Sequence, residues 1–309
     1  MKANLHLHSR ISDGTEWPQE IAERAYRTGL SLVALTDHDS LAGVVEFQNA
    51  AEKLGLTAVP AVEIDCIAPE IEYKSELLAY FPVSSGGVSA GRSSCPYQQT
   101  QEMLLSVIKN RYNYVRASIQ KAQRHFVAVH LRFDDFLKHK RSGRPELPIE
   151  AFSFSKVDLF LFFKSKGIID QNISYRAFKK AYLETGLLSG SPYNKLHCQQ
   201  VVETVHADGG LVVLPHFGHE FDDQIQTIKT NRKRFLKLLD YFVELGIDGI
   251  ELYWYRNEDT IAINKLIAGE AKKRNLFLTY GSDCHGPGSG KETMNEFYGD
   301  MSSEIFTKL

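Results

Sequence analysis

Residues 18–38 have the sequence PQEIAERAYRTGLSLVALTDH, in which a helix pattern is followed directly by a strand pattern. Pro18 stands near the start of the helical part, apolar residues recur at helical spacing, and Gly29 marks its end. The run from Ser31 to His38 then predicts a buried strand that ends in polar residues. This unit of helix and strand sets the pattern for most of the chain.

Four more apolar runs predict strands, at 3–8, 57–63, 209–216 and 276–283. Each ends in a side chain that can bind a metal: the final residues are His8, Glu63, His216 and Asp283. Helical patterns separate most of the runs, which predicts repeated βα units in a parallel barrel or sheet. In such barrels the carboxyl ends of the strands meet on one face, so we expect these side chains to gather there.

The regular alternation is interrupted once. A run at 76–81 predicts a fourth strand, and the Ser/Gly-rich stretch 84–94 then marks a boundary. Long helical patterns replace the alternation from 98 to 193. We therefore predict an α/β protein, a distorted (β/α)7 barrel formed by residues 1–97 and 194–309, with an inserted and mainly helical domain at 98–193.

The composition of the chain is that of an ordinary globular protein. Its 309 residues are 43% hydrophobic and 24% charged, enough to bury a large core. A net charge of −2 gives no strong overall attraction to nucleic acid or membrane. The four cysteines form no Cys-x-x-Cys pair, which favours a reducing compartment. Without a signal-like leader or a long apolar run, we expect a cytoplasmic protein with no membrane contact and no obligate protein partner.

The spacing of the polar residues indicates a metal site. His6 and His8 are two residues apart on an expected strand, so both side chains point to one face, and Asp283 and His285 repeat this spacing. Cys284 between them is expected to face away as a small buried residue. Glu63 ends a buried strand, where a carboxylate is costly unless it is paired or bound to metal.

Two aspartates have ordinary structural explanations as well. Asp13 lies in Ser-Asp-Gly, a sequence typical of turns. It becomes a candidate metal ligand only because other candidate ligands accompany it. His38 is expected at the rim of the barrel. Asp39, which follows it, is expected to be the N-cap of a helix that continues to about Leu54.

The order His-x-His, Ser-Asp-Gly, Thr-Asp-His-Asp, Val-Glu-Ile, Pro-His and Gly-Ser-Asp-x-His resembles the PHP family, named for polymerase and histidinol phosphatase. Within that family the chain is most similar to metal-dependent phosphoesterases that carry a helical insertion and act on nucleotides or short RNA ends. The resemblance covers the barrel on both sides of the insertion and fades inside it. It implies a distorted seven-stranded barrel with two or three divalent ions at the strand ends.

The resemblance also implies a set of ligands for each ion. One ion would be held by His6, His8, Glu63 and Asp283. A second would be held by Asp13, His38 and His285. A middle ion would be held by His216 and the bridging Glu63, which are thereby the expected catalytic residues. Many members have a histidine where this chain has Glu76; a glutamate can ligate but changes the metal preference, so a two-metal centre stays open.

The ligand chemistry fits hydrolysis of a phosphate ester. Imidazole and carboxylate ligands without thiolate suit manganese, iron or zinc. Paired ions about 3.5–4 Å apart can share a hydroxide and clamp the attacking and leaving oxygens. The sequence has neither a Walker-type phosphate loop nor a nucleophilic-serine elbow. We therefore predict a metal-dependent phosphoesterase, a nucleotide phosphatase or exonuclease, that cleaves phosphate esters of nucleotides or short oligonucleotides through a metal-bridged hydroxide.

Substrate contacts are expected from the insertion. Between Lys109 and Arg144, ten lysines and arginines face two aspartates. A solvated helical face would explain this run, but the same charges could hold a second phosphate or a nucleic-acid backbone. We expect Arg132 and Arg144 to bind the substrate, a phosphorylated small molecule or nucleic-acid end, together with His219 near the predicted metal ligands.

Two other functions remain open on the sequence. An amidohydrolase-like enzyme that cleaves C–N bonds also begins with His-x-His, and Lys74 would then be its modified lysine. A non-catalytic PHP module that only binds metal is the second alternative. Asp13, Glu63 and the pair Asp283 and His285 fit the phosphoesterase better than either.

Overall fold

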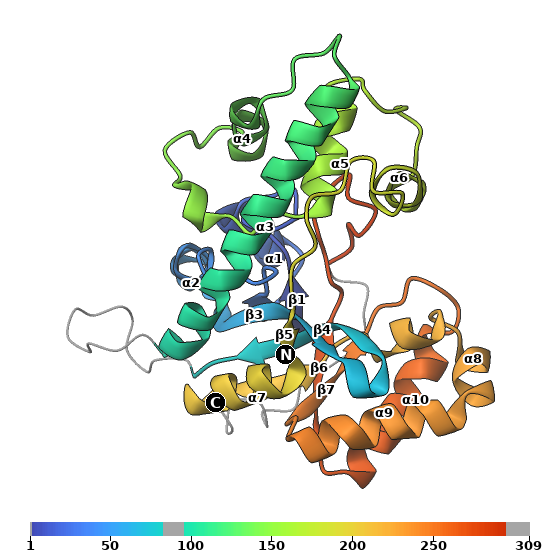
Figure 1. Cartoon of the computed structure of the whole chain (residues 1–309). Coiled ribbons are helices and arrows are strands. Elements are labelled where there is room, and N and C mark those ends of the chain that lie inside the picture. The colour runs from blue at the N-terminus through green and yellow to red at the C-terminus, as the bar shows by residue number, and fades with distance from the viewer. Residues whose placement is uncertain (1, 83–95, 295–309) are drawn as a thin grey trace.

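The protein is described by a computed structural model that covers residues 2–82 and 96–294. Seven strands form a nearly closed, barrel-shaped sheet in the order β1-β2-β3-β4-β6-β7-β8 (Figure 1). The strands are β1 (Ala3–Leu7), β2 (Leu32–Leu35), β3 (Thr57–Ala68), β4 (Tyr73–Tyr80), β6 (Leu211–Leu214), β7 (Gly249–Tyr253) and β8 (Phe277–Gly281). A short strand, β5 (Leu196–His197), pairs with β3. The predicted α/β barrel is confirmed.

The barrel closes between its first and last strands. Leu7 and Cys284 form a parallel bridge, and the His8 N–H donates to the Cys284 carbonyl at 2.9 Å. Inside the barrel, small and branched side chains pack together with Tyr80, whose hydroxyl donates to the Leu5 carbonyl at 2.9 Å. The two polar ends of β1 and β8 are thereby held side by side.

The expectation of an all-parallel sheet is wrong at β4, which runs antiparallel to both β3 and β6. The chain passes from β3 to β4 through only a short turn, the 3-10 segment Pro69–Ile71 followed by Glu72 in the left-handed region. A parallel pair requires a long crossover connection, whereas an antiparallel pair needs only such a turn. β3 is also longer than expected, because it continues past Glu63 to Ala68.

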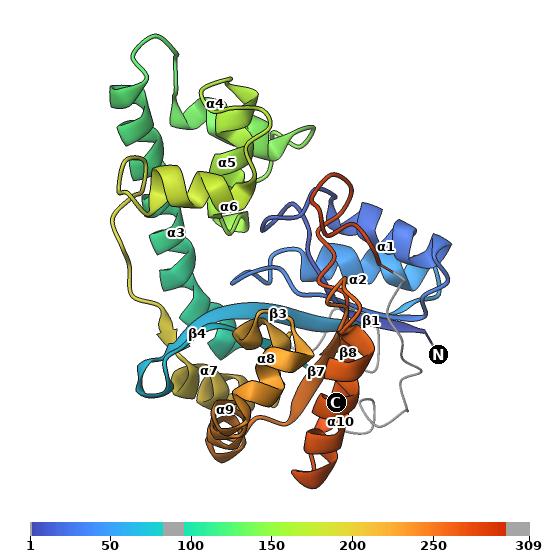
Figure 2. The same ribbon diagram turned by 90° about the vertical axis from the view of Figure 1, so that its right-hand side faces the viewer.

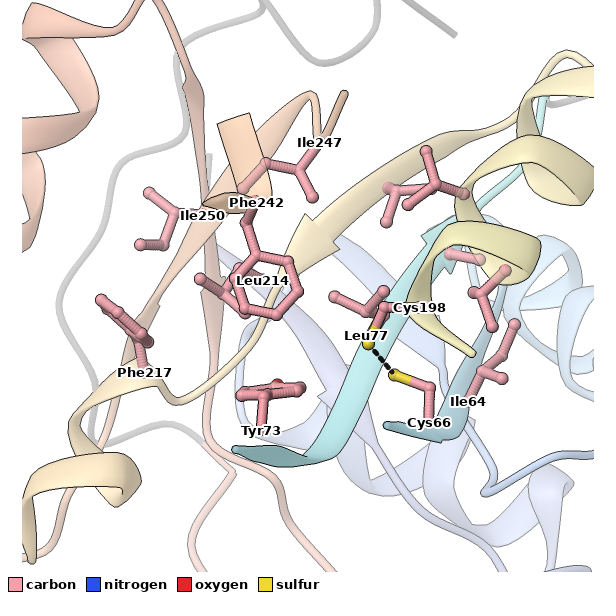
Figure 3. Packing of buried hydrophobic residues seen from close by; sticks show 14 of the residues in the cluster. Ile64, Cys66, Tyr73, Leu77, Cys198, Leu214, Phe217, Phe242, Ile247 and Ile250 are labelled. Carbon is pink, nitrogen blue, oxygen red and sulfur yellow. Dashed lines mark hydrogen bonds between the residues drawn. The ribbon is translucent and has the colours of Figure 1, made fainter. Parts of the chain in front are cut away.

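Helices cover the outside of the barrel. They are α1 (Pro18–Arg27), α2 (Val44–Lys53), α7 (Cys198–Ala207), α8 (Ile225–Thr230), α9 (Arg232–Leu245) and α10 (Thr260–Lys273). The prediction that Asp39 caps α2 is wrong, since the helix begins only at Val44, after Gly43. The largest core cluster joins α7, α9 and α10 to the sheet, and Figure 3 shows Tyr73 and Phe242 in edge contact there.

A second group of helices stands beside the barrel (Figures 1 and 2). It comprises α3 (Gln98–His125), α4 (Phe133–Arg141), α5 (Lys156–Ser165), α6 (Tyr175–Phe178) and a π-helical turn (Lys179–Leu183). We call residues 98–183 the helical lobe. Its core is rich in aromatic residues such as Phe136, Phe152 and Phe162. The division of the chain into domains at 98 and 193 stays a prediction, and the stretch 84–94 lies outside the described residues.

Among the described residues, no helix is both long enough and apolar enough to cross a membrane.

Candidate metal centre

The nine predicted metal ligands all lie at one end of the barrel, on or just after the strands. They are five histidines and four carboxylates: His6, His8, His38, His216, His285, Asp13, Glu63, Glu76 and Asp283. Most of them are buried, which is unusual for ionisable groups unless they are paired or bound to metal. Six separate strands contribute to this end of the barrel, so the site exists only in the folded chain.

The ligand atoms fall into three groups, in each of which all atoms lie within 4.8 Å of one another. The first group is His6, His8 and Asp283. The second is His8, Asp13, His38 and His285. The third is Glu63, Glu76 and His216. These groups match the three predicted ion sites closely, with His8 shared between two of them, and the assignment of ions to ligands stays a prediction.

Glu63 lies at the centre of the three groups. Its Oε2 is 3.3 Å from His6 Nε2 and 3.2 Å from His8 Nε2. The same oxygen is 3.2 Å from His38 Nδ1. The other oxygen, Oε1, is 3.0 Å from His216 Nε2. Because its two oxygens face different groups, this carboxylate is placed to bridge neighbouring ions.

Asp13 and Asp283 connect the remaining histidines. Asp13 Oδ1 is 3.1 Å from His285 Nε2 and 3.7 Å from His38 Nε2. Asp283 Oδ1 is 3.2 Å from His8 Nε2. Among the described residues, His8 Nδ1 and His38 Nδ1 are buried yet make no hydrogen bond. Buried nitrogens without a hydrogen-bond partner fit ligands for divalent ions.

In this site, burial and nearby opposite charges shift the pKa values of the side chains in opposite directions. Burial works to lower the pKa of the His8 imidazole, but hydrogen bonds to Asp283 and Glu63 outweigh it and raise that pKa to about 9. Burial works to raise the pKa of Glu63, but the charges of His6 and His38 bring it well below its ordinary value. A divalent ion would replace protons on these histidines, so its binding would release protons.

Glu76 differs from the other carboxylates. Its Oε2 is 3.8 Å from His216 Nε2, so it occupies the position of a ligand in the third group. Burial and the nearby charges of Asp65 and Glu63 raise the pKa of Glu76 to about 7. Ser75 donates a hydrogen bond to Glu76 Oε2 at 2.6 Å. This carboxyl therefore changes its charge near neutral pH, unlike Glu63.

Two of the ligands have unusual backbone conformations. His216 has a φ of 29° and Asp283 a φ of 50°, both in the region that favours glycine. Hydrogen bonds hold these residues: the His216 N–H donates to Glu251 Oε2 at 2.9 Å. Strained backbone at a cluster of buried polar side chains is typical of functional sites.

Glu251 was missed in the sequence analysis. It lies on β7, is fully buried, and its Oε1 is 2.8 Å from His6 Nδ1, while its Oε2 accepts from the His216 N–H. It therefore orients ligands of two groups at once. The signal was present, since a single glutamate within an apolar strand follows the same rule that singled out Glu63.

Lys291 was also missed, and Asp37, which precedes His38 at the end of the expected strand, was given no role of its own. Asp37 accepts hydrogen bonds from the Ser9 N–H at 2.7 Å and from the Ser12 hydroxyl at 2.6 Å, which fixes the loop that carries Asp13. Lys291 pairs with Asp283 Oδ2 and places a cation at the edge of the centre. Sequence offers no local signal for Lys291, because it follows the last ligand in a Gly-rich loop.

The three predicted substrate-binding residues lie in different places. His219 stacks on His216, with ring centroids 4.7 Å apart, and is therefore brought to the centre. Arg144 donates to Glu46 at 2.7 Å and lies over the Trp17 ring. Arg132 is largely exposed and lies 3.5 Å from Asp135. Among the described residues, 2–82 and 96–294, no contact joins Arg132 or Arg144 to any of the nine predicted ligands. The roles of the two arginines stay predictions.

Lys74, the residue on which the amidohydrolase alternative depends, is exposed on β4. Glu76, two residues further along the same strand, is the β4 residue that belongs to a ligand group. The group that includes His216 is completed by two carboxylates, Glu63 and Glu76, and contains no lysine. This arrangement favours the phosphoesterase ligand set over that of an amidohydrolase.

The fold and these groups together define the class of protein. It is a class of barrel enzymes with imidazole and carboxylate ligands for divalent ions at the strand ends. The PHP domain signature matches residues 4–186, more than half of the chain, and the chain belongs to the PHP family. The predicted family is confirmed. PHP phosphoesterases depend on metal ions, and the ligand groups described above can hold them.

Relatives and solved structures agree with this membership. The chain is 26% identical over 288 residues to a phosphoribosyl 1,2-cyclic phosphate 1,2-diphosphodiesterase of Eggerthella lenta, across 93% of this chain and 95% of the relative. It is 43% identical over 61 residues, 20% of this chain and 21% of the relative, to a 3′,5′-nucleoside bisphosphate phosphatase of Chromobacterium violaceum. A candidate metal-dependent phosphoesterase of Bifidobacterium adolescentis has a similar fold, with a TM-score of 0.74, 23% identity and coverage of 100% and 96% of the two chains.

Proposed function

We propose that this chain hydrolyses phosphate esters of nucleotides or short oligonucleotides at a centre of two or three divalent ions. Membership of the PHP family supports a metal-dependent phosphoric ester hydrolase. The relatives in Eggerthella lenta and Chromobacterium violaceum, a cyclic phosphodiesterase and a bisphosphate phosphatase, act on phosphorylated small molecules. A cytoplasmic location remains a prediction of the sequence.

The observation that carries the proposal is the position of Glu63. One of its oxygens faces His6, His8 and His38, while the other faces His216. A carboxylate placed in this way would hold neighbouring divalent ions, which are the ions that metal-dependent phosphoryl transfer uses. Bound ions would supply Lewis-acid polarisation of the phosphoryl oxygens and activation of the attacking water.

The chain's own residues would orient and neutralise the substrate. Lys291, whose side chain is 41% exposed beside Asp283, is placed to contact a phosphate oxygen. His219, which is half-buried and pairs with Asp223, lies beside His216 at the same edge. Burial lowers the pKa of His219, so that its imidazole is mostly neutral near pH 7. We propose that these two side chains face the phosphate while Glu63 and His216 hold its metal partners.

The donor set favours manganese, iron or zinc, because it combines imidazole with carboxylate and lacks thiolate. Glu76 supplies an oxygen where many family members have a nitrogen, and hard oxygen ligands shift the preference of the third group toward manganese. We therefore propose manganese as the ion to test first. The number of ions, two or three, depends on whether Glu76 ligates.

The test is hydrolysis of a panel of substrates with added Mn²⁺, run in parallel on the His8→Ala variant. The panel contains adenosine 3′,5′-bisphosphate and AMP, followed by phosphate release, and a cyclic ribose phosphate and a short 5′-phosphorylated RNA, followed by chromatography of the ring-opened product and of the released nucleotides. We expect hydrolysis that requires metal and is lost in the variant, because His8 belongs to two ligand groups. Bound metal is counted in both proteins by elemental analysis.

The outcomes separate the alternatives. Metal-dependent hydrolysis of one member of the panel identifies the substrate class. Bound metal with no hydrolysis of any phosphate ester would contradict the proposal and favour a module that only binds metal. Release of ammonia or amine from amide substrates, tested with the same protein, would support the amidohydrolase alternative instead.

A further inference from the structure

Arg111 lies on α3 at the level where this helix passes from the barrel to the helical lobe. Leu104 and Val107, two turns and one turn earlier, pack into the barrel core, whereas Tyr114 and Val115 pack into the lobe core. The Arg111 side chain is only 8% exposed. A buried charge requires partners inside the protein, so its contacts decide what it does.

The guanidinium of Arg111 connects three segments of the chain. Its Nε donates to Asp39 Oδ2 at 2.7 Å, and its Nη2 donates to Asp65 Oδ2 at 2.8 Å. Its Nη1 donates to the carbonyl of Phe154, in the lobe, at 3.3 Å. The planar fork of an arginine suits such fixed, directional contacts, which the point charge of a lysine cannot reproduce.

The two carboxylates that Arg111 contacts belong to the segments that carry His38 and Glu63. Asp39 follows His38 directly, and its N–H donates to the Glu63 carbonyl at 2.7 Å. Asp39 Oδ1 in turn accepts from the Asp65 N–H at 2.9 Å. Asp39 has a φ of 51°, a conformation that costs energy for any residue other than glycine. Its side-chain contacts therefore hold a strained turn directly beside a predicted ligand.

The charges around this turn depend on Arg111. Lys195 also approaches Asp65, with its Nζ 3.4 Å from Oδ2. Among the ion pairs of the described residues, Asp39 has Arg111 as its one cationic partner. Without the guanidinium, the buried Asp39 carboxylate would face the partly buried Asp65 without a cation of its own, and an uncompensated buried charge disturbs its surroundings strongly.

We infer that Arg111 is a positioning residue that couples the helical lobe to the metal centre by holding the Asp39 turn, which follows His38, and the part of β3 around Asp65, which follows Glu63. The inference rests on the proposed function, because it requires that His38 and Glu63 bind metal. Arg111 touches neither the ligand atoms nor a substrate and acts only through the two aspartates. Since coupling between two parts of a protein is reciprocal, metal binding also favours the docked position of the lobe.

The experiment compares Arg111→Met with Arg111→Lys and with the control Arg116→Met, which removes an exposed arginine from the same helix. Mn²⁺ affinity is measured by calorimetry, and hydrogen exchange of peptides from α3 to α5 is measured with and without Mn²⁺. In the wild-type protein and the control, we expect Mn²⁺ to slow exchange in the lobe. In Arg111→Met, we expect that protection to be lost and the affinity to fall roughly tenfold, the lower end for residues that orient ligands.

If Arg111→Met proves unstable, Arg111→Lys takes its place, because it retains the positive charge. The Mn²⁺ affinity of Arg111→Lys and the protection of its lobe by Mn²⁺ are expected to lie between those of the wild-type protein and Arg111→Met. Wild-type affinity and unchanged Mn²⁺-dependent protection in both variants would overturn the inference. That outcome leaves the proposed function intact. A wild-type protein that binds Mn²⁺ but hydrolyses no phosphate ester would instead contradict the proposed function, while the affinity and exchange measurements still decide the role of Arg111. A wild-type protein that binds no Mn²⁺ overturns both.

Discussion

The buried side chain of Glu251 contacts two of the predicted ligands and fixes their orientation. Its two oxygens contact the His6 ring and the His216 backbone, which belong to different ligand groups. A carboxylate on the far ring nitrogen of a histidine fixes the tautomer and aims the near nitrogen at the metal. Burial works to lower the pKa of His6, but Glu251 and Glu63 outweigh it and raise that pKa well above its ordinary value.

Replacement of Glu251 by glutamine should weaken metal binding. The amide retains an oxygen for one contact but loses the negative charge that orients His6, so we expect Mn²⁺ affinity to fall about 10- to 100-fold, the usual effect of such supporting carboxylates. Calorimetric titration measures this directly. Glu258→Gln, which changes an exposed glutamate after the same strand, is the control. Equal affinities for the two variants would show that Glu251 only fills space.

The sequence singled out side chains that the structure brings together, because their spacing follows strand geometry, and their role as metal ligands stays a prediction. His6 and His8, like Asp283 and His285, are two residues apart, and the pairing alone places them on one face. Arg111 and Lys291 could not be found in this way, because each reaches the site from a helix or loop whose position depends on tertiary packing. Asp39 was interpreted as a helix cap, since Asp-Ser before an apolar run is typical of one. Its contact with Arg111 from α3 explains the difference.

At the scale of elements, the packing of β8 against β7 leaves no space at Gly281. An added Cβ would lie 2.0 Å from Glu251 Oε1 and 2.4 Å from His6 Cβ. We expect Gly281→Ala to displace Glu251, to weaken Mn²⁺ binding, and to lower the free energy of unfolding by about 1–3 kcal/mol, the usual cost of overpacking. Urea unfolding and metal titration measure the two effects.

A glycine elsewhere provides the control for Gly281. Gly269, on α10, has no atom within 4 Å of an added Cβ. Alanine should stabilise the helix there by about 0.5–1 kcal/mol and leave Mn²⁺ affinity unchanged. Comparable losses of affinity in both variants would mean that the close packing around Gly281 is not what supports the centre.

Helices α9 and α10 are joined through Glu270. Burial works to raise the pKa of this glutamate, but hydrogen bonds from Lys273, Arg274 and Arg232 lower it to about 2. A carboxylate with a lowered pKa stabilises the fold fully above its unfolded-state value of about 4.5 and loses that contribution as pH falls toward 2. Partial exposure of its partners limits the contribution to about 1–2 kcal/mol.

Glu270→Gln should therefore destabilise the protein at pH 7 and matter less in acid. We expect the urea midpoint of the variant to lie below that of the wild-type protein at pH 7 and pH 5, with the gap narrowing from pH 4.5 to pH 3. A gap that stays constant over this range would show that packing, rather than charge, accounts for the effect of the substitution.

The elements themselves were predicted with uneven success. The helix predicted from Pro18 to Gly29 matches α1 to within about two residues, because proline, glycine and apolar spacing mark its ends. The direction of β4 was wrong, since local sequence predicts a strand but not its partner. A turn as short as Pro69–Glu72 indicates an antiparallel pair only once both flanking strands are known at full length.

At the scale of the whole molecule, the helical lobe contacts the loop that carries Asp13. The Ser153 N–H donates to the Ile11 carbonyl at 2.9 Å. Lys140 of α4 donates to the Ser12 carbonyl and pairs with Asp158 at 2.6 Å, and it is almost fully buried. The lobe therefore supports one ligand loop through Lys140, just as it supports two strand ends through Arg111.

Removal of the Lys140 charge should destabilise this junction. In Lys140→Met, Asp158 is left buried without its cation, and breaking a buried pair from one side costs about 3–5 kcal/mol. Lys140→Met combined with Asp158→Asn should recover much of that loss, because no buried charge remains unpaired.

Lys138→Met, a substitution at an exposed position on the same helix, is the control and should change stability little. Urea unfolding of the wild-type protein, the single variants Lys140→Met and Asp158→Asn, and the double variant gives the coupling energy between Lys140 and Asp158. Lys140→Met should also bind Mn²⁺ more weakly, since the Asp13 loop loses its anchor at Ser12. If the double variant is as unstable as Lys140→Met, or if Mn²⁺ affinity is unchanged in both, the lobe does not support the Asp13 loop through this pair.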